Sequence, residues 1–187
     1  MTRLDALPPR SYRHARLGLV SATVAGIAAL AWATFAAPRP RLVYNPSDSV
    51  AIGWYRVDAL ARRSDALPVG SVVLVRLPAD AAGLAAQRGY LPARVPLLKR
   101  VGAIAPQCVC VVGRVVRIDG VPVAAALRAD RAGRPLRAWR ACRRLHAGEL
   151  FLLSVTNAAS YDSRYFGPVR AGDVLGIAHR LWPEARP

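Results

Sequence analysis

Lysine is almost absent from this 187-residue chain, although basic residues are abundant. Lysine and arginine together number 27, against 11 acidic residues, and Lys99 is the one lysine among them. A guanidinium stays protonated in proteins, whereas an ammonium in apolar surroundings can lose its proton near neutral pH. Lys99 lies in the apolar stretch 95–104, which predicts a buried or half-buried strand. Lys99 therefore either has no special role and extends its amine to the surface, or acts as a base in catalysis.

Histidine is scarce as well, with three residues in the whole chain. They are scattered, at His14, His146 and His179. A metal site needs more ligands at closer spacing than these histidines and three cysteines offer. The sequence therefore predicts no metal and no cofactor.

The formal net charge of +16 raises the question of a nucleic-acid partner. The arginines are scattered along the chain, and the aromatic residues do not interleave with them as base-stacking platforms would. Attraction to anionic lipid head groups explains the excess charge at least as well. We expect a lipid bilayer as a partner and no nucleic acid.

One long apolar run, Leu17 to Ala37, contains no charged residue. At a helical rise of ~1.5 Å per residue it spans roughly 30 Å, the hydrocarbon thickness of a bilayer. The small residues near its end, 35–37, leave a cleavable secretory signal as the alternative, but the run is longer than a usual signal core. We favour a retained membrane anchor.

Arginines are more frequent before this run than directly after it, which favours a cytoplasmic N-terminus. The flanking arginines are Arg3, Arg10, Arg13 and Arg16 before the run, and Arg39 and Arg41 after it. The sequence predicts a cytoplasmic segment 1–16, a transmembrane anchor 17–37 and a periplasmic domain 38–187, in a single-pass protein of the inner membrane.

Three cysteines occur in the part expected outside the cytoplasm, where disulfides persist. Cys108 and Cys110 are two apart on a predicted strand, so they share a face and are poorly placed to bridge each other. We expect a disulfide between Cys142 and either Cys108 or Cys110.

The exported part is expected to be mainly β, because short runs rich in Val, Ile and Leu alternate with turn residues. Asp119-Gly120 predicts a hairpin, 79–88 predicts one helix, and 128–144 predicts a polar excursion from the sheet. The predicted strands are 53–57, 71–77, 95–104, 108–118, 121–125, 150–155 and 173–179.

Two further segments share with Lys99 a composition that structure alone does not require. The first is 45–55, Asn-Pro-Ser-Asp-Ser-Val-Ala-Ile-Gly-Trp-Tyr, and the second is 159–168, Ala-Ser-Tyr-Asp-Ser-Arg-Tyr-Phe-Gly-Pro. The first could be only a turn with capping serines. The second could be only a surface loop, in which Asp162 and Arg164 form an exposed ion pair worth at most about 1 kcal/mol.

Taken in order, these segments resemble the boxes of the type I signal peptidases. The matching boxes are Ser49-x-x-x-Gly53-x-Tyr55, Leu97-Leu-Lys-Arg-Val101, Ser160-x-Asp162-Ser-Arg-Tyr-Phe-Gly-Pro168 and a final strand containing Gly176. Within that family the sequence is most similar to the conjugal-transfer peptidases, the TraF group. The resemblance covers about 44–182 and implies an antiparallel β domain of the signal-peptidase/LexA type.

The resemblance also implies a role for each residue. It implies Ser49 as the nucleophile and Lys99 as the neutral amine that takes its proton, which is chemically sound because a hydroxyl needs a base at neutral pH. The backbone N–H of Ser49 and the Ser47 hydroxyl match positions that stabilise the oxyanion. Asp162 would orient the lysine or its loop, and Ser160 and Arg164 would hold that loop.

The implied substrates are exported precursors cut after small residues, with a conjugative pilin propeptide as the specific expectation. Two departures from the family pattern bear on substrate class: Ala51 replaces a common proline, and Pro106-Gln107-Cys108 replaces Pro-Gly-Asp. Neither change removes a reacting group.

Four alternatives remain open. One is a housekeeping type I signal peptidase; another is a non-catalytic, membrane-tethered assembly factor of a conjugation or secretion channel. A Ser-His-Asp triad using His146 or His179 would leave the lysine without a role. Self-cleaving repressors share the Ser-Lys chemistry but carry a DNA-binding domain where this chain has an apolar span.

Overall fold

A computed structural model describes residues 9–35, 41–60 and 67–182, and the chain divides into two compact units, Met1–Arg39 and Pro40–Pro187. The first unit contains one helix, α1 (Pro9–Phe35), in which His14–Trp32 is long and apolar enough to cross a membrane. Its hydroxyls at Ser21 and Thr23 bond to backbone carbonyls three and four residues earlier, so both of these polar groups have a partner within the helix. The predicted span overlaps α1 from 17 to 35, and 36–37 lie outside the described residues.

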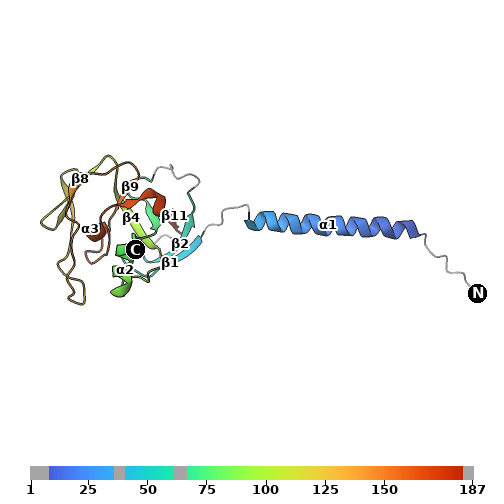
Figure 1. Cartoon of the computed structure of the whole chain (residues 1–187), viewed down its shortest axis with the longest axis horizontal. Helices are drawn as coiled ribbons and strands as arrows, with labels where there is room; N and C mark the ends of the chain where they lie inside the picture. Colours follow the sequence, from blue (N-terminus) through green and yellow to red (C-terminus); the bar gives the residue numbers. More distant parts are fainter. Residues whose placement is uncertain (1–8, 36–40, 61–66, 183–187) are drawn as a thin grey trace, which may run out of the picture. The chain divides into compact units, whose positions relative to one another are not determined.

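The second unit is built on a seven-stranded antiparallel sheet with the order β1-β2-β11-β3-β4-β9-β10 (Figure 1). The strands are β1 (Arg41–Asn45), β2 (Gly53–Asp58), β3 (Val72–Val75), β4 (Leu97–Ile104), β9 (Glu149–Leu152), β10 (Val169–Arg170) and β11 (Val174–Arg180). The predicted mainly β, antiparallel fold class is confirmed.

A second antiparallel sheet has four strands in the order β7-β6-β5-β8. They are β5 (Cys108–Val112), β6 (Val115–Ile118), β7 (Val121–Ala125) and β8 (Cys142–Arg144). The Asp119-Gly120 hairpin is confirmed, and both residues adopt positive φ as a two-residue hairpin turn of this type requires. The single strand expected over 108–118 is wrong, because a turn at Gly113 (φ 64°) folds it into the pair β5 and β6.

The helices of the second unit are short. They are α2 (Ala79–Gln87), α3 (Ser163–Phe166) and the 3-10 turn η1 (Ala171–Asp173). The predicted helix 79–88 is confirmed to within one residue. The sequence did not indicate α3, whose single turn begins where the Asp162 carboxylate accepts the backbone N–H of Arg164. It also missed the short strands β1, β8 and β10, which carry little apolar alternation.

Strand β4 contributes to all three groups of buried apolar side chains in this unit. Leu98 packs with the residues around β2, Val101 with those between β3 and β9, and Ala103 with those between β9 and the second sheet. Lys99 sits between Leu98 and Val101 and is itself buried. A strand packed on several sides gives this lysine a rigid backbone.

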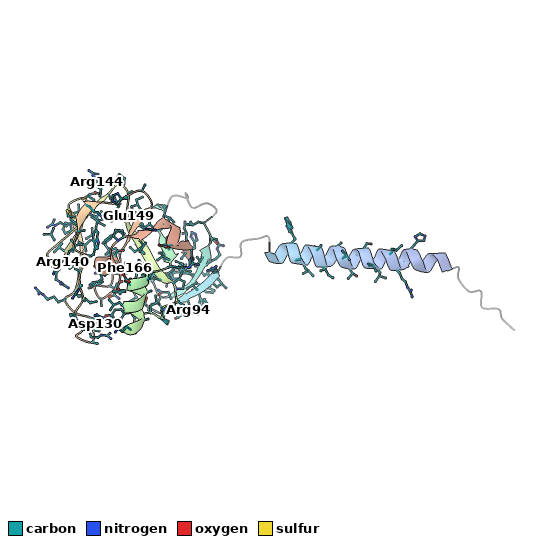
Figure 2. All side chains as sticks on the ribbon, in the orientation of Figure 1. Arg94, Asp130, Arg140, Arg144, Glu149 and Phe166 are labelled. Carbon is teal, nitrogen blue, oxygen red and sulfur yellow. A yellow bond between two sulfur atoms is a disulfide. The ribbon has the colours of Figure 1, made fainter. Side chains whose placement is uncertain are left out.

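The disulfide joins Cys110 to Cys142, which are directly opposite each other on β5 and β8, and Cys108 is a free thiol. This decides between the two pairings expected from the sequence. The arginines cover several sides of the unit: Arg94, Arg140 and Arg144 are exposed and lie at different edges in Figure 2.

We expect Gly176→Ala to destabilise this unit by about 1–3 kcal/mol, as overpacking a well-filled site does. A Cβ at Gly176 on β11 would meet the Asp58 carbonyl and lie 2.8 Å from Val57 Cγ1 on β2. Gly172→Ala is the matched control, because a Cβ there meets nothing within 4 Å. Urea unfolding of the full chain in detergent measures both, and an equal effect of the two substitutions would contradict the packing argument.

Candidate active site

A cleft of about 720 Å³ opens where the end of β1 and the loop after it face the start of β4. Ser47, Ser49, Lys99 and Ser160 all line it, although they come from three separate parts of the sequence. The remaining two predicted site residues, Asp162 and Arg164, are buried beside Ser160. The fold therefore brings the three segments that the sequence singled out to one place.

Lys99 is 2% exposed, and its Nζ donates a hydrogen bond of 2.8 Å to Ser160 Oγ. Burial lowers the pKa of Lys99 from its usual 10.5 to about 8; the Asp162 and Asp48 carboxylates oppose this change, and Arg164 adds to it. A substantial fraction of this amine is neutral at mildly alkaline pH, so it can accept a proton.

Ser49 is buried, and its Oγ lies 3.1 Å from Ser47 Oγ. Asn45 organises this loop: its amide nitrogen donates to the carbonyls of Ser47, Val50 and Ala51, and its amide oxygen accepts the Ser47 backbone N–H and hydroxyl. The sequence did not indicate a role for Asn45. The available signal was the run Asn-Pro-Ser-Asp, since asparagine side chains bond the backbone of turns.

The serine loop is tied directly to the loop that carries Ser160. The Asn157 side-chain amide donates to the Asp48 carboxylate, and the Thr156 hydroxyl reaches the Asp48 carbonyl at 3.5 Å. These contacts hold the loop that carries Ser49 against the loop that carries Ser160, the hydrogen-bond partner of Lys99. The relative position of the serine and the lysine therefore depends on both loops.

Asp162 and Arg164 form a buried ion pair, with exposures of 0% and 1%. Arg164 Nε and Nη2 bond the two carboxylate oxygens at 2.9 Å each, and the carboxylate also accepts the backbone N–H of Ser154. The interpretation of 159–168 as a surface loop with a solvated ion pair is therefore wrong. Paired and fully hydrogen-bonded, the two charges satisfy the conditions under which burial is tolerated.

The same guanidinium also holds the backbone around Ser160, with Nη2 shared between the Asp162 carboxylate and two carbonyls. Its guanidinium bonds the carbonyls of Asn157 at 3.0 Å, Ser160 at 3.3 Å and Ala125 at 2.9 Å. In the described residues Asp162 makes no hydrogen bond to Lys99; its carboxylate bonds Arg164 and the Ser154 backbone, and its charge acts on the lysine through space. Ser160, expected only to support that loop, instead contacts the lysine directly.

Among the described residues, Lys99 and Ser49 are not hydrogen-bonded to each other; their bonds run to Ser160 and Ser47 respectively. Such contacts often tighten only when substrate is present. Neither histidine of the alternative triad lines the cleft: His146 is exposed, and His179 lies 3.6 Å from Asp58 on the outer part of β11 and β2.

Comparison with known proteins first defines the class as a peptidase, because residues 14–182 match the family described as "Signal peptidase, peptidase S26". The chain is 35% identical over 175 residues to the "Probable conjugal transfer protein TraF" of Sinorhizobium fredii, covering 88% of this chain and 87% of that protein. It is 38% identical over 147 residues to the "Conjugal transfer protein TraF" of Agrobacterium fabrum, covering 74% and 80%. The chain belongs to the S26 signal peptidase family, in the group of these TraF proteins.

Among solved structures, a signal peptidase I of Enterococcus faecalis is similar over 60% of this chain and 97% of its own, with 16% identity and a TM-score of 0.38.

We expect Arg164→Leu to lower the free energy of unfolding by about 3–5 kcal/mol, because the Asp162 charge would stay buried without its partner. Arg56→Leu is the matched control: Arg56 also pairs with an aspartate two residues away, but at 52% and 41% exposure. Such an exposed pair contributes at most about 1 kcal/mol. Urea unfolding of both full-length variants checks the difference, and equal losses would contradict it.

Proposed function

We propose that this protein is a membrane-anchored serine endopeptidase in which Ser49 is the nucleophile and Lys99 the general base. One observation carries the proposal: a buried lysine whose pKa is about 8 shares a cleft with a buried serine. A structural lysine gains nothing from this burial, whereas a base for a hydroxyl needs it.

The hydrogen bond to Ser160 orients the side-chain amine of Lys99. A neutral amine has two N–H donors and one lone pair, and one donor is used by the Ser160 hydroxyl. The lone pair then accepts the Ser49 proton as Oγ attacks the scissile carbonyl carbon. The resulting ammonium returns that proton to the leaving amine, and a water molecule activated in the same way releases the acyl product.

The tetrahedral intermediate needs donors for its negative oxygen. We assign this role to the backbone N–H of Ser49 and the hydroxyl of Ser47. In the structure that hydroxyl donates its one proton to the Asn45 amide oxygen at 3.0 Å, so it must rotate toward the oxyanion when substrate binds. Removing one donor of this kind typically costs ~3 kcal/mol of transition-state stabilisation.

The proposed substrates are exported precursor proteins cut after small residues. β1 is an edge strand, and its last residues line the cleft, so an extended substrate segment can add alongside it through backbone hydrogen bonds. Anchoring by α1, with the second unit in the periplasm, would restrict enzyme and membrane-bound precursor to one surface and so raise their effective concentration.

The names of the relatives favour a precursor used in conjugal transfer, with a pilin propeptide as the specific candidate. A housekeeping signal peptidase would share the chemistry and accept general signal peptides. Cleavage of a pilin-type precursor and of a general signal-peptide precursor, compared in the same membranes, distinguishes the two.

We expect Ser49→Ala and Lys99→Arg each to abolish precursor cleavage, the first because the nucleophile is lost and the second because a guanidinium cannot act as a base. Ser71→Ala, in the turn before β3, is the control and should cut normally. The assay co-expresses precursor and full-length variant in membranes, and limited proteolysis verifies folding. Cleavage by folded Lys99→Arg would overturn the dyad, and failure of the wild type on every precursor would favour the assembly-factor role.

We expect kcat/KM to rise with pH through an apparent pKa of about 8 and to level off above it, because the neutral form of Lys99 is the reactive one. Below that pH each unit should reduce the rate about tenfold. A flat profile between pH 6 and 9 would contradict Lys99 as the base.

Ser160→Ala removes the hydrogen bond that directs the amine, so kcat should fall more than KM changes.

A further inference from the structure

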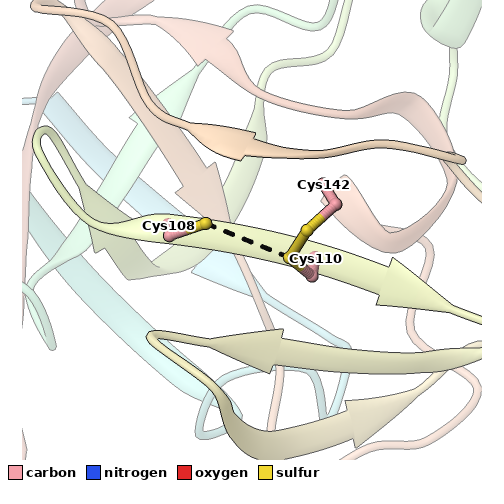
Figure 3. Close-up of side chains that lie close together, drawn as sticks. All are labelled: Cys108, Cys110 and Cys142. Atoms are coloured by element: carbon pink, nitrogen blue, oxygen red, sulfur yellow. Dashed lines mark hydrogen bonds between the residues drawn. A yellow bond between two sulfur atoms is a disulfide. The ribbon is translucent and has the colours of Figure 1, made fainter.

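The three cysteines gather on one face of the second sheet (Figure 3). Cys110 and Cys142 form the disulfide between β5 and β8, and the free Cys108 Sγ lies 3.9 Å from Cys110 Sγ. All three sulfur atoms lie within 4.8 Å of one another. Cys108 and Cys110 share a face because they are two residues apart on one strand.

The free thiol and one half of the disulfide are open to solvent, since Cys142 is exposed and Cys108 is half-buried. By strand register Arg144 on β8 is opposite Cys108, and Arg117 on β6 is opposite Cys110. Their guanidinium groups bond the carbonyls of Pro106 and Gly120, and the Asp119 carboxylate accepts the backbone N–H of Cys108. The thiolate is the form of a cysteine that attacks disulfides, so we expect exchange at this site to need alkaline pH.

The strand held by this disulfide has few other ties to its sheet. β8 has three residues, lies at the edge and pairs with β5 alone. It follows the polar excursion whose residues Asp130, Arg131 and Arg134 line the cleft. The Cys110–Cys142 disulfide therefore attaches the C-terminal end of the excursion 128–144 to the second sheet, and the earlier part of that excursion forms part of the cleft wall.

We propose that Cys108, Cys110 and Cys142 form a thiol–disulfide exchange site. The Cys108 thiolate attacks Cys110 Sγ, its nearest sulfur neighbour; the Cys108–Cys110 bond forms as the Cys110–Cys142 bond breaks, and the electron pair leaves on Cys142 Sγ. Cysteines two apart on a regular strand are poorly placed to bridge, so β5 must distort between Cys108 and Cys110 as this bond forms. The number of thiols and disulfides is unchanged, so no oxidant or reductant is consumed. The released Cys142 thiolate lies at the surface, where a small thiol, a disulfide or an electrophile can reach it, and β8 loses its covalent tie.

The test uses the full-length chain in detergent micelles, shifted from pH 5 to pH 8.5 without added thiol and trapped at intervals with excess N-ethylmaleimide. Trypsin places Cys142 on the peptide 141–143, apart from Cys108 and Cys110 on 101–114. Mass spectrometry should find an increasing fraction of labelled Cys142 together with a 101–114 peptide that contains an internal disulfide. The rate should not depend on protein concentration, because the step is intramolecular.

Cys108→Ser removes the attacking thiol and is expected to show no labelled Cys142 at any time, while its unfolding curve stays close to that of the wild type. The proposal is overturned if wild-type Cys142 stays unlabelled while Cys108 labels completely. Labelling of Cys110 in place of Cys142 would overturn the proposed order of attack. Neither readout requires peptidase activity, so the result is independent of the proposed function.

Discussion

The buried Asp162–Arg164 ion pair is the interaction on which the arrangement of the cleft depends. Its two charges neutralise each other in the interior, and the same guanidinium also binds three backbone carbonyls, including that of Ser160. Ser160 in turn holds the amine of Lys99. A planar, permanently charged fork with five donors suits this task, whereas a lysine at Arg164 would satisfy fewer acceptors.

The same logic explains why the chain keeps one lysine and many arginines. Arginine serves where a charge must persist, as in the buried pair and on the exposed surface. In the proposed mechanism Lys99 is the position where the charge must be removable, and it lies on the strand shared by the three groups of buried apolar residues that the structure describes. Burial disfavours the ammonium, and the nearby Asp162 carboxylate limits how far the pKa falls. These opposing effects leave the pKa of the amine at about 8, which suits the proposed role of a base.

Much of the fold could be predicted because strands, turns and apolar runs are local features. The Asp119-Gly120 hairpin, the helix at 79–88 and the strand carrying Lys99 follow from residues adjacent in sequence. The misses have a common cause. The turn at Gly113 interrupts a valine-rich stretch, and β1, β8 and β10 are short strands that form because each pairs with a neighbouring strand: β1 with β2, β8 with β5 and β10 with β9. Local patterns cannot indicate a strand that its neighbours create.

The sequence by itself determined the chemistry available: one removable positive charge, serines in a turn-rich segment, and an apolar helix of bilayer length. It also determined which residue types resemble the S26 boxes. Only the tertiary structure decided that Asp162 and Arg164 are buried and not solvated, that Ser160 contacts Lys99, and that Cys142 pairs with Cys110. The reason is physical: burial depends on which other segments cover a residue, and Ser160 and Cys142 meet partners that are 61 and 32 residues away in the chain, which local propensity does not encode.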